Sequence, residues 1–240
     1  MLNGLDLFSG IGGIATGLKE FVRPLAYCEI DPYCQSVLLQ RMQEGNLPKA
    51  PIWDDISSFP TPKLGGGSSD IITAGFPCQD ISIAGKGKGL DGERSGLFFE
   101  IMRLAKEFKP SFIFLENVPA ITSRGGLRVV REIASLGYDC RWCVISAASV
   151  GALHKRERWF LLANSKSQES RRLPSREEER QSSTRICGQY ATIDEWQKAV
   201  SEMGKLSDGL PYHVDRLKAL GNSVVPQQVK RAWDILWNGR

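Results

Sequence analysis

Short apolar runs alternate with helical periodicities along most of this 240-residue chain. Uniformly apolar runs of strand length predict strands that are buried on both faces, and apolar residues that recur every three or four positions predict helices. Strands are predicted at 5–8, 25–28, 52–56, 70–74, 111–115, 138–146 and 158–163. Helices are predicted after the glycines at 10–13, and at 32–42, 97–108, 127–136, 193–203 and 226–237. This alternation predicts an α/β fold.

The pattern breaks at Asn164, where apolar residues become rare. Residues 164–190 hold six Lys or Arg and four Glu among Ser and Gln, so this stretch cannot build a core of its own. Residues 216–226 are predicted to form a loop before the last helix. The chain is therefore divided into a main domain at 1–163, an appended segment at 164–210 and a C-terminal segment at 211–240.

Composition narrows the class of protein. Hydrophobic residues make up 42% and charged residues 24%, and the net charge is +4, as in a soluble protein that is compatible with a nucleic-acid partner. No apolar run approaches a membrane span, so we expect a cytoplasmic location and no membrane partner. The six cysteines are expected to be reduced, and Cys140 and Cys143 would point to opposite faces of a strand, so no metal site is predicted.

The first strand is followed by Ser9-Gly-Ile-Gly-Gly13, and the second ends at Glu29-Ile30-Asp31. A glycine-rich turn before a helix lets backbone N–H groups approach a ligand, although a plain tight turn has the same pattern. An acidic residue about 20 residues later, at the tip of the second strand, is placed to bind ribose hydroxyls. The pair predicts a site for an adenosine moiety.

Cys78 lies in Gly75-Phe-Pro-Cys-Gln-Asp80, directly after a predicted buried strand. Ligands of open α/β sheets bind beyond the carboxyl ends of the strands, so Cys78 is a candidate nucleophile. The alternative is that the thiol packs as a small buried hydrophobe.

Charged residues at other strand ends extend this site. Glu116 follows the strand at 111–115, and alternation in an extended chain places Arg156 and Arg158 on the same side. The glycine-rich stretch 85–94 is a candidate lid, with a solvated surface loop as the alternative.

Taken together, these motifs resemble the DNA (cytosine-5) methyltransferase family. The resemblance covers 1–163 and about 211–240, and the motifs follow the family's order. They are Asp6-Leu-Phe-Ser-Gly-Ile-Gly-Gly13, Glu29-Ile-Asp31, Asp54-Asp-Ile56, Gly75-Phe-Pro-Cys-Gln79, Glu116-Asn-Val118, Arg156-Glu-Arg158 and Gly221-Asn-Ser-Val-Val-Pro226.

The resemblance implies a doubly wound, mostly parallel seven-stranded sheet with one antiparallel strand, and S-adenosylmethionine as cofactor. It implies that Glu29 holds the ribose, and that the C-terminal segment returns to close the cofactor pocket beside the first segment. The residues implied to contact the cofactor are Phe8, Gly10, Gly12, Glu29, Ile30, Asp55, Ile56, Pro77, Asn222 and Ser223.

The implied reaction is methylation of cytosine C5 in double-stranded DNA. Cytosine C5 is a poor nucleophile, so the Cys78 thiolate adds at C6, while Glu116 contacts N3 and the exocyclic amine and shares a proton. Arg156 and Arg158 are implied to hold the cytosine O2 and to favour the thiolate. The base must leave the duplex for this chemistry, and the 85–94 stretch matches the family's mobile loop.

Family members usually carry a sizeable target-recognition domain between the arginine and asparagine motifs, whereas only about 164–210 is available here. Three interpretations follow: a minimal enzyme with short specificity, an enzyme that borrows specificity from a partner chain, or a degraded copy with weak DNA binding. We favour the first, with basic residues of the segment on phosphates or simply solvated. A cognate restriction nuclease, tRNA as the substrate, and a non-catalytic DNA binder stay open.

Overall fold

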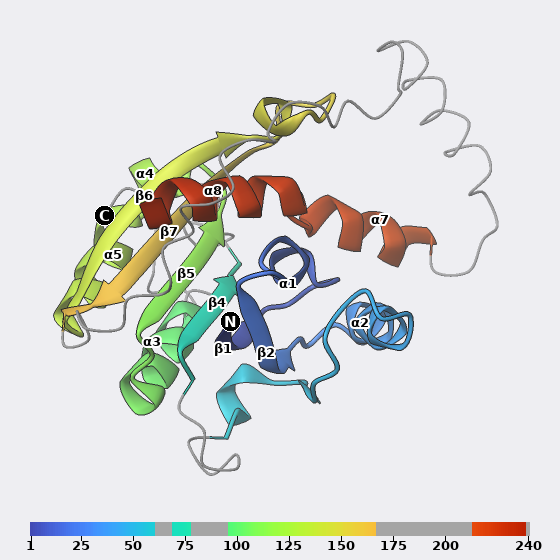
Figure 1. The fold of residues 1–240 in the computed structure, drawn as a ribbon, viewed down its shortest axis with the longest axis horizontal. Helices are drawn as coiled ribbons and strands as arrows, with labels where there is room; N and C mark the ends of the chain where they lie inside the picture. The colour runs from blue at the N-terminus through green and yellow to red at the C-terminus, as the bar shows by residue number, and fades with distance from the viewer. Residues whose placement is uncertain (61–68, 78–95, 167–212, 239–240) are drawn as a thin grey trace.

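The computed structural model describes residues 1–60, 69–77, 96–166 and 213–238, and these residues form one sheet with helices on both faces (Figure 1). The strand order is β3-β2-β1-β4-β5-β7-β6. The strands are β1 (Leu2–Leu7), β2 (Val22–Cys28), β3 (Ile52–Trp53), β4 (Ile71–Gly75), β5 (Phe112–Asn117), β6 (Tyr138–Ser146) and β7 (Glu157–Ser165). All neighbours from β3 to β5 pair in parallel, and β7 runs antiparallel to both β5 and β6. The predicted seven-stranded sheet with one antiparallel strand is confirmed.

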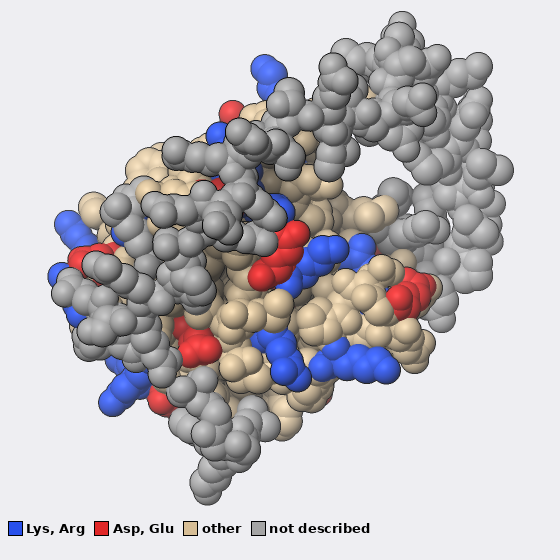
Figure 2. All heavy atoms as spheres, in the orientation of Figure 1, with Lys and Arg blue, Asp and Glu red and all other residues tan. Residues whose placement is uncertain are grey.

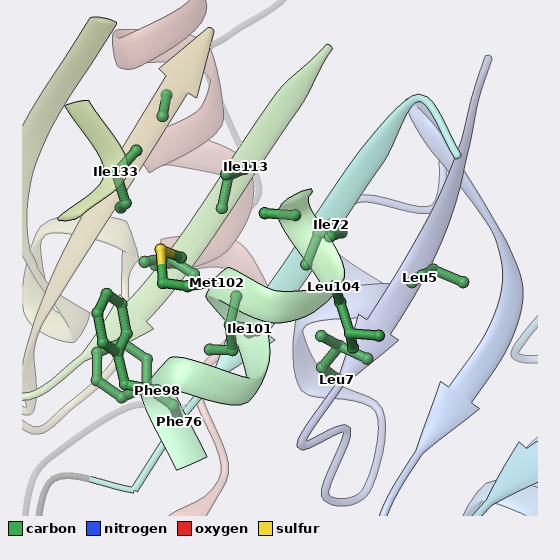
Figure 3. Packing of buried hydrophobic residues seen from close by; sticks show 14 of the residues in the cluster. Leu5, Leu7, Ile72, Phe76, Phe98, Ile101, Met102, Leu104, Ile113 and Ile133 are labelled. Atoms are coloured by element: carbon green, nitrogen blue, oxygen red, sulfur yellow. The ribbon is translucent and has the colours of Figure 1, made fainter. Parts of the chain in front are cut away.

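The sheet separates two layers of the hydrophobic core, and helices cover each layer. The helices are α1 (Gly13–Gly17), α2 (Pro32–Gln43), α3 (Gly96–Phe108), α4 (Ile121–Arg124), α5 (Gly126–Ser135), α7 (His213–Asn222) and α8 (Pro226–Asn238), with short 3₁₀ turns η1 (Ile56–Ser58) and η3 (Ala147–Val150). On one face of the sheet α3 and α5 bury Phe98, Ile101 and Ile133 against the strands (Figure 3). On the other face α1 and α8 bury Ile14 and Trp233. This double cover explains why the strands are almost uniformly apolar.

The C-terminal segment corrects one prediction. The stretch 216–226 is not mainly a loop, because α7 continues to Asn222 and only residues 223–225 separate it from α8. The run Arg216-Leu-Lys-Ala-Leu220 consists of good helix formers, and Gly221-Asn222 mark the end of that helix rather than an open loop.

Helix α8 packs directly on α1, so the last segment of the chain lies beside the first. A Cβ atom on Gly17 would lie 2.6 Å from the backbone oxygen of Pro226, so only glycine permits this approach. The Trp233 ring stacks on Trp237 and meets Phe114 of β5 edge-on, which anchors α8 to the centre of the sheet.

The remaining elements differ from the predictions mainly at their ends. Strands β1 and β2 begin earlier than predicted, whereas β3 is only two residues long and is followed by η1. Strand β7 extends to Ser165, past the predicted boundary at 163. The predicted helix at 193–203 and most of the 164–210 segment lie outside the described residues, so the division into domains stays a prediction.

Charges of both signs share the described surface in Figure 2, where Lys and Arg side chains lie next to Asp and Glu. Ion pairs join some of the exposed charges, such as Lys230 of α8 with Glu20. None of the described helices has the length and hydropathy needed to cross a membrane.

Candidate active site

A tight turn follows β1 and opens the carboxyl edge of the sheet. Phe8, Gly10 and Gly12 all have left-handed backbone angles, with φ of 54°, 53° and 83°. The Ser9 N–H donates to the Cys28 oxygen of β2, which ties the turn to the neighbouring strand. A side chain at Gly12 would be strained by its φ and would meet Leu47 at 2.6 Å, so the turn requires glycine there.

Glu29, at the tip of β2, closes this turn from the other side. Its Oε2 accepts the Gly10 N–H at 2.6 Å and its Oε1 accepts the Asp31 N–H at 2.8 Å. The carboxylate is buried, and burial raises its pKa from the ordinary value while the backbone N–H groups oppose the shift. Each carboxylate oxygen keeps a second lone pair, so Glu29 can still accept hydrogen bonds from a ligand.

The segment after β3, Asp54-Asp-Ile56, lies next along the chain from the β2 tip and carries two more carboxyl groups. Asp55 accepts the Ser57 N–H at 2.9 Å, which lowers the pKa of its carboxyl group. Ile56 is buried and its oxygen accepts from Arg103 of α3 at 2.9 Å, whereas Ile30 is 71% exposed. Single exposed apolar side chains are common on protein surfaces, and Ile30 is one that directly follows the buried Glu29.

The C-terminal segment reaches the same edge. Lys218 of α7 donates to Asp31 at 2.8 Å, and this pairing lowers the pKa of the Asp31 carboxyl group. Asn222, the last residue of α7, is exposed, and Ser223 follows it with its N–H on the Ala219 oxygen. Lys218 therefore connects α7, whose last residue is Asn222, to the segment that follows Glu29.

Glu116 lies one position from the end of β5 rather than in the loop after it, and it is 9% exposed. Arg158 of β7 places its Nε 2.8 Å from Glu116 Oε1. Burial raises the pKa of Glu116 to about 7, with the charges of Arg158 and Arg156 acting in the opposite direction. A carboxyl group with this pKa exchanges its proton near neutral pH.

Arg156 takes a different set of partners from Arg158. Its Nη2 donates to the Gly221 oxygen at 2.6 Å and to the Ser223 oxygen at 2.5 Å. Burial lowers the pKa of its guanidinium, although the group stays charged at any physiological pH. The two arginines of one motif thus contact the two sides of the site, Arg158 the carboxyl group and Arg156 the C-terminal segment.

The backbone leading to Cys78 is held by contacts from α3 and β5. Phe76 packs against Phe98 at the start of α3 (Figure 3), and its oxygen accepts the Asn117 side-chain amide at 3.1 Å. Asn117 Oδ1 in turn accepts the Val118 N–H at 2.8 Å. Pro77 is exposed, and Cys78 and the 85–94 stretch lie outside the described residues. Asn117 therefore fixes the main chain two residues before Cys78.

The cysteines that the structure describes are buried or half-buried. Burial and nearby carboxylates raise the pKa of the Cys28 and Cys34 thiols to about 12, which keeps both protonated. Cys140 packs on the α3 and α5 side of the sheet and Cys143 on the α8 side. Within the described part of the chain, no group of three or more His, Cys, Asp or Glu is arranged to hold a metal ion.

Three contributors were not assigned from the sequence. Asn117 is part of the Glu116-Asn-Val118 motif, so the motif itself was the available signal. A Cβ on Gly75 would lie 3.1 Å from Glu116 Oε2, a constraint that appears only once β4 and β5 are paired. The contact from Lys218 to Asp31 spans 187 positions and has no local sequence signal.

A parallel sheet with a glycine-rich turn after its first strand, an acidic tip on its second and one antiparallel strand defines an α/β methyltransferase fold. The family model for C-5 cytosine-specific DNA methylases matches residues 2–232. This chain belongs to that family.

Individual relatives agree with this assignment. The chain is 34% identical over 237 residues to type II methyltransferase M.CviJI of Paramecium bursaria Chlorella virus IL3A, which covers 98% of the chain and 59% of the relative. It is 36% identical over 163 residues to M.HhaI of Haemophilus parahaemolyticus, covering 66% of the chain and 47% of the relative. The solved structure of S. pombe Dnmt2 methyltransferase shares the fold, with a TM-score of 0.56 and 23% identity over 69% of this chain and 51% of that one.

The chain thus spans about half the length of these relatives, from 47% to 59%. The family model, which matches residues 2–232, spans the sheet and the motifs at its carboxyl edge.

Proposed function

We propose that this chain transfers a methyl group from S-adenosylmethionine to C5 of cytosine in double-stranded DNA. The observation that carries the proposal is the buried Glu116, whose pKa is about 7 and whose Oε1 lies 2.8 Å from Arg158. Membership of the C-5 cytosine-specific family supports the choice of reaction.

The residues at the tips of β1 and β2 fit S-adenosylmethionine. The turn at Gly10 has open space where a Cβ would stand, and Glu29 keeps free lone pairs next to it for ribose hydroxyls. Ile30 and Ile56 would hold the adenine, Asp55 its amine, and Phe8, Gly12, Pro77, Asn222 and Ser223 would complete the pocket. When bound, this cofactor supplies an electrophilic methyl group on a sulfonium.

Glu116 and Arg158 would hold the cytosine. The protonated carboxyl group donates to N3, so negative charge does not accumulate on the ring when sulfur adds at C6. Arg158 Nε is engaged by Glu116 and one Nη1 proton by the Glu157 oxygen, so within the described part of the chain both Nη2 protons remain for the cytosine O2.

Cys78 would be the nucleophile. Its thiolate forms a bond to C6 and makes C5 nucleophilic, and after methylation loss of the C5 proton expels the thiolate and restores the ring. The target base must first leave the stack, at a cost of about a few kcal/mol. Asn117 would support the attack by Cys78, because its side chain fixes the Phe76 oxygen and hence the main chain that leads into Cys78.

The test is transfer of a labelled methyl group from S-adenosylmethionine to duplex DNA and, in a parallel assay, to tRNA. The proposal predicts label in DNA at cytosine C5, with bisulfite sequencing of DNA from expressing cells giving the sequence context. Label in tRNA alone would assign the alternative substrate, and label in neither would contradict the proposal.

The sequence context also bears on the partners. A short recognised sequence would support the minimal-enzyme interpretation, and its match to a nuclease site would support a cognate restriction nuclease, because relatives such as M.HhaI are named as type II methyltransferases. Methylation that requires a second protein would support borrowed specificity.

A further inference from the structure

The Arg156 side chain makes two contacts with the C-terminal segment. Its Nη2 carries two protons, and one points to the Gly221 oxygen and the other to the Ser223 oxygen. This nitrogen therefore has no proton left for another acceptor.

These two acceptors lie at the C-terminal end of α7, where a positive charge is stabilising. Gly221 is in the last turn of α7, whose final carbonyl groups have no donor within the helix and carry the negative end of the helix dipole. The Arg156 guanidinium supplies the missing donors and charge. It also joins α7 to the residue that follows it, because Ser223 lies beyond the helix end.

The main chain of Arg156 is held by the same segment. Gln228 of α8 is fully buried, and its side-chain amide donates to the Arg156 and Ile145 oxygens, each at 2.8 Å. Arg156 is thus fixed at its backbone by α8 and uses its side chain to fix the turn between α7 and α8.

Helix α7 has a second attachment, through Lys218. Lys218 contacts Asp31 near the tip of β2, but its side chain is 60% exposed, and exposed ion pairs contribute little. The Arg156–Ser223 contact is part-buried, whereas the Arg156–Gly221 and Lys218–Asp31 contacts are exposed, and both Arg156 contacts lie at the end of α7. They hold the two residues, Asn222 and Ser223, that the proposed function places at the cofactor.

We propose that Arg156 is a positioning residue for the cofactor pocket: it holds the Gly221–Ser223 turn in place, while Arg158 serves the cytosine. This inference rests on the proposed function and replaces the shared role that the family resemblance implies for both arginines.

The experiment measures binding of S-adenosylhomocysteine to the full chain by calorimetry, for the parent, Arg156→Gln and Arg156→Lys. We expect the Kd to rise about tenfold or more in Arg156→Gln, because two carbonyl groups lose a charged donor. In Arg156→Lys, whose ammonium is less suited to both carbonyls, the Kd should lie between these values. The KM for S-adenosylmethionine should rise by the same factor, with kcat at saturating cofactor within about threefold of the parent.

Arg141→Gln is the matched control. Arg141 of β6 also donates to a carbonyl of the C-terminal segment, that of Leu236 at 3.4 Å, but far along α8 from the Gly221–Ser223 turn. Its removal should leave the Kd unchanged.

A parental Kd in both Arg156 variants, with a fall in kcat, would overturn the proposal and return Arg156 to the cytosine. If Arg156→Gln does not fold, as judged by circular dichroism, Arg156→Lys decides alone, and a parental Kd in it overturns the proposal. Failure of the parent itself to bind the probe would instead count against the proposed function.

Discussion

Two buried carboxyl groups at strand ends, Glu29 directly after β2 and Glu116 on β5, have the same exposure of 9%. Burial raises the pKa of both. Their partners differ, because Glu29 accepts two backbone N–H groups, whereas Glu116 faces the guanidinium of Arg158. Glu29 is arranged as a fixed acceptor, and Glu116 as a group that exchanges a proton near neutral pH.

The comparison shows that burial and residue type do not by themselves set a carboxyl group's role. One of the N–H groups that hold Glu29, that of Gly10, belongs to the turn that Glu29 shapes, so this carboxylate has a structural role and can also accept from a ligand. Glu116 is aligned by one arginine and keeps Oε2 directed at Gly75, next to the chain that leads into Cys78. The cofactor side and the base side of one sheet edge are therefore built from the same residue type with different donors.

Glu116→Gln should have the largest effect on activity. The amide can still donate a hydrogen bond but cannot transfer a proton, so kcat should fall about 10²–10⁴-fold. In the parent, kcat/KM should decline as the pH rises through about 7, because the protonated carboxyl group is the active form. Steady-state methylation between pH 6 and 9 measures both.

In Glu116→Gln the residual kcat/KM should not decline as the pH rises through about 7. A decline near pH 7 that persists in Glu116→Gln would show that another group titrates there.

Asp6 extends the comparison to a third buried carboxyl group, which accepts from the Thr73 hydroxyl and leaves Oδ2 without a partner among the described residues. Burial raises the pKa of Asp6 to about 6, so the folded state binds its proton more tightly than the unfolded state. This stabilisation is complete below pH 4 and is lost as the pH rises toward 6, by about 3 kcal/mol in total.

Asp6→Asn removes the titrating group and should flatten that part of the stability curve. Urea unfolding of parent and variant at pH 4 to 7 gives the free energy of unfolding at each pH. Parallel curves for the two proteins would contradict the assignment to Asp6.

Glu29→Gln tests the acceptor role. A glutamine cannot accept both backbone N–H groups through its two terminal atoms, since one of them is an amide nitrogen. The loss of a hydrogen bond to a charged group predicts a rise of about 10- to 100-fold in the Kd for S-adenosylhomocysteine. We expect a smaller fall in kcat at saturating cofactor, and an unchanged Kd would show that Glu29 only shapes the turn.

Gly75→Ala should give the smallest effect. The new Cβ would lie 3.1 Å from Glu116 Oε2, so the carboxylate must move by a few tenths of an ångström. We expect kcat to fall by several-fold with an unchanged cofactor Kd, because small displacements of a reacting group lower its effectiveness. In the control Gly96→Ala the Cβ meets no heavy atom within 4 Å, and its kcat should match the parent.

The sequence predicted the sheet well because its strands are apolar on both faces and end at glycine, proline or charge. Strand β6 and helix α2 agree with their predicted ranges to within one residue. Helix α7 was missed because Gly221 and Asn222 were interpreted as loop residues, although both also end helices.

Local sequence patterns could not predict contacts between segments that are far apart in the chain. Alternation predicted Arg156 and Arg158 on one side of an extended chain, but it could not show that their acceptors lie on different elements. The position of Glu116 at the end of β5 followed from the pattern, whereas its pKa depends on burial that only the packed fold reveals. Cys78 lies outside the described residues, and its role stays a proposal.

The most direct test of covalent catalysis by Cys78 is trapping on DNA. Duplexes of random sequence with 5-fluorocytosine throughout one strand are incubated with the protein and S-adenosylmethionine, and adducts stable to denaturation are mapped by mass spectrometry. We predict an adduct on Cys78 that disappears in Cys78→Ser. An adduct that persists in Cys78→Ser, or a parent protein that methylates DNA but forms no adduct, would contradict the account.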